Sequence, residues 1–148
     1  MTRLFLFIFI LLLLTVYLPL PANSQNMSLT VIANGKGIPA EMKMDQLRSI
    51  IRGEKLRWPD GSKVVIALMK TNTPIGVNTS KKIYNMSENE LNKYWLALVF
   101  QGKANAPNFF NSESDLGEFV SQTNGAIGIL SQPPTNNKVI IVDGKKSL

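Results

Sequence analysis

The residues best suited to binding a ligand form a polar loop and the helical stretch that follows it. Backbone N–H groups at a helix start and side-chain hydroxyls both favour a negative charge, so this pattern predicts a site for a small oxyanion. Thr-Asn-Thr-Pro is also an ordinary composition for a solvated turn and helix cap, and that interpretation stays open. The candidate ligand residues are Lys70, Thr71, Asn72, Thr73, Thr79 and Ser80.

A second candidate loop, Asn34-Gly35-Lys36, follows the first apolar run of the chain. Ligands in open α/β sheets lie beyond the carboxyl ends of the strands, and a loop after a strand is placed there. The alternative interpretation of Asn34-Gly35-Lys36 is a simple connecting turn.

Enzyme chemistry is poorly supported by the residue types. The chain contains neither Cys nor His, which removes the thiol nucleophile, the usual general base and most zinc sites. Thr79-Ser80-Lys81-Lys82 lacks the Ser-x-x-Lys spacing of a serine acyl-enzyme, and Gly35-Lys36-Gly37 is too short for a phosphate-binding P-loop. The sequence therefore predicts a protein that is not an enzyme and that needs no cofactor or metal.

The charge of the chain is modestly basic. Lys and Arg number 16 against 10 Asp and Glu, giving a formal net charge of +6. The basic residues are scattered, and Lys81-Lys82 and Lys145-Lys146 are their tight groups. Nucleic-acid modules show a denser basic stripe with interleaved aromatics, so nucleic acid is not an expected partner.

The N-terminus has the pattern of a secretory signal. Arg3 precedes an apolar run over 4–20, and Ala22 and Ser24 occupy the positions that signal peptidase recognises. We predict a signal peptide over 1–24 and a single domain over 25–148, located in the periplasm or secreted, without a stable membrane anchor after cleavage. An uncleaved anchor is the alternative, because about 17 apolar residues already span a bilayer. Pro19 and Pro21 favour cleavage, since they end the helix before the cleavage site.

The elements that must position the candidate loops alternate between strand and helix along the mature chain. Strands are expected at 29–32, 63–69, 126–130 and 139–142, and helices at 44–51, 74–84, from Ser87 to about 101, and from 112 to about 122. Ser87 and Glu90 have the spacing of a capping box, and the helix they begin carries an apolar face. This alternation predicts an α/β fold with a mixed, mostly parallel sheet. The expected apolar face consists of Leu91, Tyr94, Trp95, Leu98 and Val99.

Three spaced motifs carry a family resemblance. In order along the chain they are Arg57-Trp58-Pro59-Asp60-Gly61, then Asn92-Lys93-Tyr94-Trp95 running on to Phe100-Gln101-Gly102-Lys103, and Asn124-Gly125-Ala126-Ile127-Gly128-Ile129-Leu130. Over 29–130 the sequence resembles the phosphate-type solute-binding proteins of ABC transporters, especially their short, single-lobe relatives. The resemblance implies a three-layer, periplasmic-binding-protein-like lobe. Trp58, Tyr94 and Trp95 are expected to fill its core rather than to bind ligand.

One departure from the family pattern bears on the ligand. The family places an Arg and a Ser-Gly-Thr turn after the strand at 63–69, where this chain has Lys70-Thr71-Asn72-Thr73-Pro74. Lys offers one flexible charge, whereas Arg grips two oxyanion oxygens at once. The resemblance implies an exported protein that binds phosphate or a related small oxyanion for uptake, with a transporter permease or envelope protein as partner. The alternative is a non-enzymatic envelope interaction or accessory module that has lost small-ligand binding.

Overall fold

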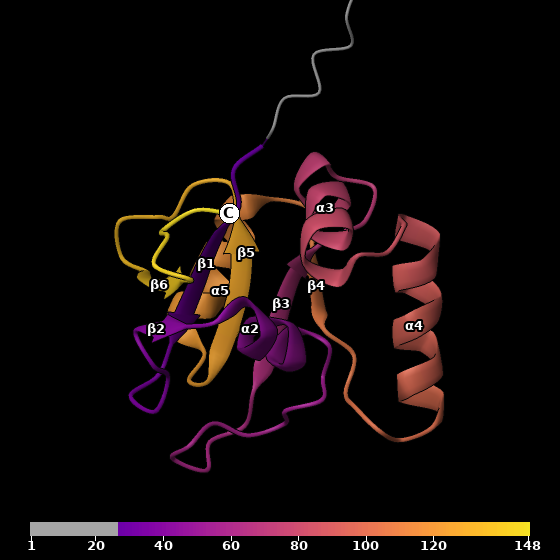
Figure 1. The fold of residues 1–148 in the computed structure, drawn as a ribbon, viewed down its shortest axis with the longest axis horizontal. Helices are drawn as coiled ribbons and strands as arrows, with labels where there is room; N and C mark the ends of the chain where they lie inside the picture. The colour runs from indigo at the N-terminus through magenta and orange to yellow at the C-terminus, as the bar shows by residue number, and fades with distance from the viewer. Residues whose placement is uncertain (1–26) are drawn as a thin grey trace, which may run out of the picture.

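The structure is a computed structural model in which residues 27–148 are described (Figure 1). The signal peptide expected over 1–24 lies outside these residues, so its prediction stays untested. Within residues 27–148, no helix combines the length and the apolar character needed to cross a membrane.

Strands and helices alternate as the sequence predicts. The expected elements are all present, and two short strands that were not expected, β2 and β4, join them. The strands are β1 (Thr30–Asn34), β2 (Glu41–Met42), β3 (Val65–Met69), β4 (Asn108–Phe110), β5 (Ala126–Leu130) and β6 (Lys138–Val142). The helices are α2 (Met44–Ile51), α3 (Pro74–Thr79), its π-helical continuation η2 (Ser80–Tyr84), α4 (Glu88–Phe100) and α5 (Glu113–Gln122).

The six strands form one sheet in the order β2-β6-β1-β5-β3-β4. β1 runs antiparallel to both of its neighbours, β5 and β6. The pairs β2 with β6, β3 with β4 and β3 with β5 are parallel. The sheet is therefore mixed and mostly parallel, as expected.

Helices cover both faces of the sheet, with α5 behind it and α2 in front of it in the view of Figure 1. α5 lies so close to the centre of the sheet that a Cβ on Gly128 would come within 2.6 Å of Leu116 and 3.1 Å of Val120. On the other side, α2 buries Leu47 and Ile51. The expected three-layer α/β lobe is confirmed.

Helix α4 begins at the predicted capping box. The Ser87 N–H donates to Glu90 Oε2 at 2.7 Å, and the Glu90 N–H donates to Ser87 Oγ at 3.3 Å. The Ser87 N–H, together with the Ser87 hydroxyl that donates to the same carboxylate oxygen at 2.8 Å, holds the pKa of Glu90 below its usual value. The helix therefore starts where two of its free N–H groups are satisfied reciprocally.

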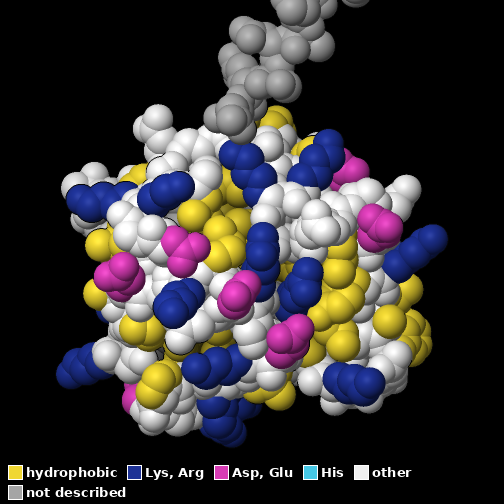
Figure 2. Space-filling model, in the orientation of Figure 1, with side chains coloured by type: hydrophobic (Ala, Val, Ile, Leu, Met, Phe, Trp, Pro, Cys, Tyr) yellow, Lys and Arg dark blue, Asp and Glu magenta, His cyan; other side chains and the backbone are white. Residues whose placement is uncertain are grey.

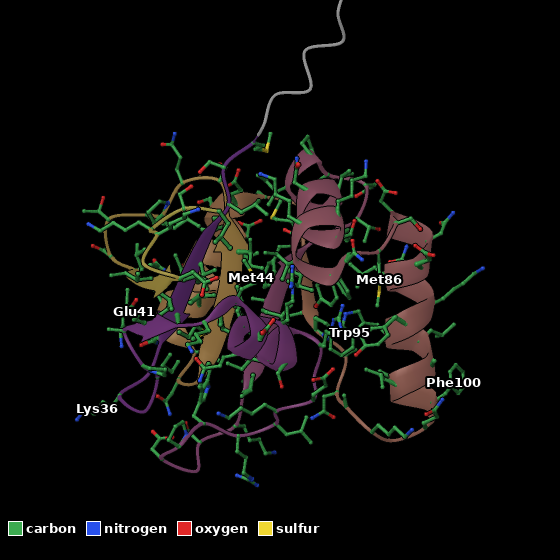
Figure 3. The ribbon with its side chains drawn as sticks, in the orientation of Figure 1. Lys36, Glu41, Met44, Met86, Trp95 and Phe100 are labelled. Carbon is green, nitrogen blue, oxygen red and sulfur yellow. The ribbon has the colours of Figure 1, made fainter. Side chains whose placement is uncertain are left out.

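The apolar face of α4 is narrower than expected. Trp95 is 3% exposed and points toward the body of the molecule, whereas Phe100 is 83% exposed and points away (Figure 3). Leu91 is also buried, but Val99, predicted on the buried face, is 43% exposed. The prediction for Val99 is wrong because α4 lies at the side of the molecule and buries only one side of its surface (Figure 1).

The first and third sequence motifs meet at one end of the sheet. The Trp58 indole N–H donates to the Gly125 carbonyl at 2.8 Å, and Trp58 is buried. Asp60 accepts from the Ser62 N–H at 3.0 Å and from its hydroxyl at 2.6 Å, which lowers the pKa of Asp60. Trp58 is a packing residue and Asp60-Gly61 a turn, as predicted.

Candidate functional site

The Lys70 loop lies at the carboxyl end of β3, where the sequence places it. The Lys70 N–H donates to the Phe110 carbonyl at 2.9 Å, and the Lys70 side chain is exposed. A cavity of about 390 Å³, called here the Lys70 cavity, opens at this point. It is lined by Lys70, Thr71, Asn72, Asn92 and Phe109. Three of the six predicted ligand residues therefore share one cavity.

The polar groups of the Lys70 cavity are donors or can act as donors. Asn92 Nδ2 lies 3.2 Å from Thr71 Oγ1, at hydrogen-bond distance. The Thr71 hydroxyl also lies 3.4 Å from Asn92 Oδ1, to which it can donate, so the two side chains are hydrogen-bonded to each other. Lys70 adds a positive charge and Asn72 a second amide, and no acidic side chain lines the cavity. Such a lining favours an anion.

Thr73 lies outside the Lys70 cavity and acts as a helix cap. Its hydroxyl donates to the Lys70 carbonyl at 2.7 Å and accepts from the Gly76 N–H at 3.1 Å. The next residue, Pro74, has no N–H to offer a ligand. The Thr73 hydroxyl and the Gly76 N–H, which were expected to be available to an anion at this helix start, are therefore hydrogen-bonded within the chain.

Thr79 and Ser80 are buried and do not line the Lys70 cavity. The Ser80 hydroxyl donates to the Val77 carbonyl at 2.9 Å, inside the helix. The cause is the helix boundary. Because α3 starts at Pro74 and runs without a break into η2, these two residues lie in the middle of a helical segment and not at its start.

Gly76 holds the Lys70 loop in place through a close backbone approach. A Cβ at Gly76 would overlap the Lys70 carbonyl oxygen. The first turn of α3 is therefore packed directly against the end of β3. Only glycine permits this distance, which fixes the direction in which the loop leaves the sheet.

The second candidate loop, Asn34-Gly35-Lys36, lies at the opposite end of the sheet. Asn34 and Val65 are both paired with Ala126, so the end of β1 lies beside the beginning of β3. The Asn34 side chain donates to the Ser121 carbonyl at 2.8 Å, which ties the loop to the end of α5. The loop lines a separate cavity of about 440 Å³ and does not join Lys70 in one site.

Comparison with known proteins relates this arrangement to solved structures. An ABC-type phosphate transport receptor from Vibrio cholerae matches 88% of this chain and 56% of its own, with a TM-score of 0.59 at 14% identity. A putative phosphate ABC transporter substrate-binding protein with bound phosphate, from Clostridium perfringens, matches 80% of this chain and 46% of its own, with a TM-score of 0.59 at 13% identity. PstS from Borrelia burgdorferi matches 80% of this chain and 48% of its own, with a TM-score of 0.54 at 13% identity.

The chain has the fold of one phosphate-type binding-protein lobe. The resemblance predicted from the three sequence motifs is confirmed at the level of fold. No protein-family model and no curated protein matches the sequence. The chain spans about half the length of the solved structures it matches, so the activity of those whole proteins does not transfer to this lobe with the fold.

Asn92 and Phe109 line the Lys70 cavity, but the sequence did not identify them as ligand residues. Asn92 belongs to a recognised motif, but its position on the polar side of α4 gave no sign that it contacts the Lys70 loop. Phe109 lies in β4, which is too short to show a periodic pattern. Over residues 27–148, no cluster of three or more carboxylates is arranged to hold a metal ion.

Proposed function

We propose that this chain is an exported, non-enzymatic binding protein that holds phosphate or a related small oxyanion in the Lys70 cavity. The observation that carries the proposal is the lining of that cavity. A lysine, a hydroxyl and two amides line it together with Phe109 and without a carboxylate, at the carboxyl end of β3. The proposed ligand residues are Lys70, Thr71, Asn72 and Asn92.

The proposed affinity is modest. Lys70 supplies one charge-assisted contact without the two-point geometry of an arginine. The cavity is open to solvent along one lobe, so the bound ion keeps part of its hydration. Uptake would then require a partner to cover the ion, either a transporter permease, another envelope protein or a second copy of the chain.

A second candidate function is that of an envelope interaction module without a small ligand. The observation that favours it is the self-capping of α3, where Thr73 uses both its donor and its acceptor within the chain. The two proposals differ in whether an oxyanion perturbs the Lys70 cavity at all.

Titration of the protein with phosphate and with sulfate, followed through backbone amide resonances, tests the first proposal. We expect saturable shifts at Lys70, Thr71, Asn72 and Asn92. The amide of buried Thr79 serves as an internal reference and should stay still. Amides of the Lys70 cavity that do not move at millimolar ligand would exclude the oxyanion proposal and leave the interaction module.

A pair of matched variants assigns the charge. Lys70→Ala is expected to weaken oxyanion binding, because it removes the cation that lines the cavity. Lys103→Ala removes an exposed lysine beyond the end of α4 and should leave binding unchanged. Equal weakening by both variants would indicate a general charge effect in place of a site.

A further inference from the structure

A second concave surface, called here the Leu56 groove, lies at the other end of β3. Its volume is about 280 Å³. Its lining residues come from the loop that follows α2, from the segment 104–108 that leads from α4 to β4, and from the start of β3. The Lys70 cavity lies beyond the last residue of β3, so the two sites are separated by the length of that strand.

The lining of the Leu56 groove is mixed, with apolar side chains beside the polar Asn105 and Asn108. Leu56 stands on its rim with 52% of its surface exposed. Covering it with an apolar ligand would remove this surface from water, a favourable process. The apolar lining consists of Leu56, Val64, Val65, Ile66, Ala104 and Ala106.

Three cations line the same groove: Lys55, Arg57 and Lys63. Across residues 27–148, the single ion pair joins Arg48 to Asp45, so none of the three cations has an acidic partner. Arg57 donates from Nη1 to the Gly61 carbonyl at 2.8 Å, which holds its guanidinium while other N–H groups stay available. Glu54 lines a neighbouring cavity with Arg48, and not this groove.

Figure 2 shows hydrophobic side chains gathered beside the position of α4, with both basic and acidic side chains adjoining them. The apolar lining residues with an unpaired cationic rim are complementary to a molecule that has an apolar body and one anionic end. The volume is close to the lower limit of about 300 Å³ for ligand pockets, so it fits a small molecule better than a protein surface.

We propose that the Leu56 groove binds a small amphipathic carboxylate, with its apolar chain over Val64 and Ile66 and its carboxylate toward Lys55, Arg57 and Lys63. This ligand class differs from inorganic phosphate, which has no apolar part. The proposal does not depend on the Lys70 cavity, since no residue lines both sites.

Titration with octanoate, followed by backbone amide resonances, tests the proposal. Saturable shifts are expected at Leu56, Val64, Ile66, Ala104 and Ala106. Octan-1-ol has the same chain without the charge and should bind about tenfold more weakly, the effect of one charge-assisted contact. Shifts spread over the whole lobe, or equal binding of the alcohol and the carboxylate, would overturn the proposal.

Three variants localise the interaction. Lys63→Gln removes one rim cation and should weaken octanoate binding several-fold, and Leu56→Ser should do so by removing the apolar rim. Lys103→Gln removes an exposed lysine outside the groove and should have no effect. All three residues are exposed, so the variants are expected to fold, and amide spectra recorded without ligand verify this. If Lys63→Gln and Lys103→Gln behave alike, the groove is not the site.

The outcome is separable from that of the phosphate experiment. Phosphate is read at Lys70, Thr71 and Asn72, and octanoate at Val64 and Ile66. Failure of one set of shifts leaves the other intact, so each proposal stands or falls on its own resonances.

Discussion

Replacement of Trp95 by Ala is expected to be the most informative test of the packing of α4. Trp95 is 3% exposed, and its ring meets the ring of Tyr94 edge-on with 5.7 Å between centroids. Its six-membered ring also reaches Gly53, where a Cβ would lie 3.0 Å from Trp95 Cη2. This single side chain therefore joins α4 to the end of α2.

The size of the effect follows from two opposing terms. A buried aromatic side chain removes about 150–250 Å² from water, and about 25 cal/mol per Å² gives roughly 4–6 kcal/mol. The Trp95 indole N–H has no hydrogen-bond partner among the described residues, and its removal returns about 1–3 kcal/mol. We expect a net loss of about 3 kcal/mol in the free energy of unfolding, the lower end of the range for Trp to Ala.

Urea unfolding of the wild type and the variant, monitored by circular dichroism, measures this loss. Phe100→Ala is the matched control, because Phe100 lies on the same helix and is 83% exposed. It should change the stability by no more than about 0.5 kcal/mol. Trp95→Phe keeps an aromatic ring and removes the unpaired N–H, so it should cost less than about half as much as Trp95→Ala. A loss below about 1 kcal/mol for Trp95→Ala would refute the assignment of the buried face.

Three further outcomes follow from local geometry. Ser87→Ala should destabilise the protein by about 1 kcal/mol through loss of the α4 cap, measured by urea unfolding against exposed Ser114→Ala. Gly76→Ala should cost about 1–3 kcal/mol and shift the amide resonances of the Lys70 loop, because the new Cβ overlaps backbone; unchanged resonances would contradict the close approach. Burial raises the pKa of Tyr84, so the folded state keeps its phenol protonated at a pH at which the unfolded chain would ionise it. The resulting contribution to stability is complete below the ordinary tyrosine pKa of about 10 and is lost as the pH rises from that value toward the raised pKa of the folded state. Tyr84→Phe should therefore reduce the alkaline loss of stability in unfolding titrations, and an unchanged slope would contradict this.

The long elements were predictable because each has a complete local signal. The Ser-x-x-Glu spacing of Ser87 and Glu90 predicts the start of α4, and an unbroken apolar run predicts β3. β2 and β4 were missed because two or three residues cannot show a period, and their pairing is decided by strands far along the chain. Val99 was misplaced because periodicity gives the direction of an apolar face but not how much of it finds a neighbour.

The site was predictable only in part, for a related reason. Lys70, Thr71 and Asn72 follow a recognisable strand, so their shared position could be inferred from the sequence. The exclusion of Thr79 and Ser80 depends on where α3 begins, and a helix boundary is the least certain element of a sequence pattern. The contribution of Asn92 depends on the packing of α4 beside the loop, which only the tertiary structure defines.

The position of β1 in the sheet sets the order in which the fold can be completed. Its two neighbours are β5 and β6, whose residues come last in the chain. Until residues 126–142 are available for pairing, β1 has no neighbouring strand. Pairing between such distant segments is slow because a long loop must close first. The centre of the sheet therefore forms only once the C-terminal strands are available, and a chain cut before β5 would leave β1 without either neighbour.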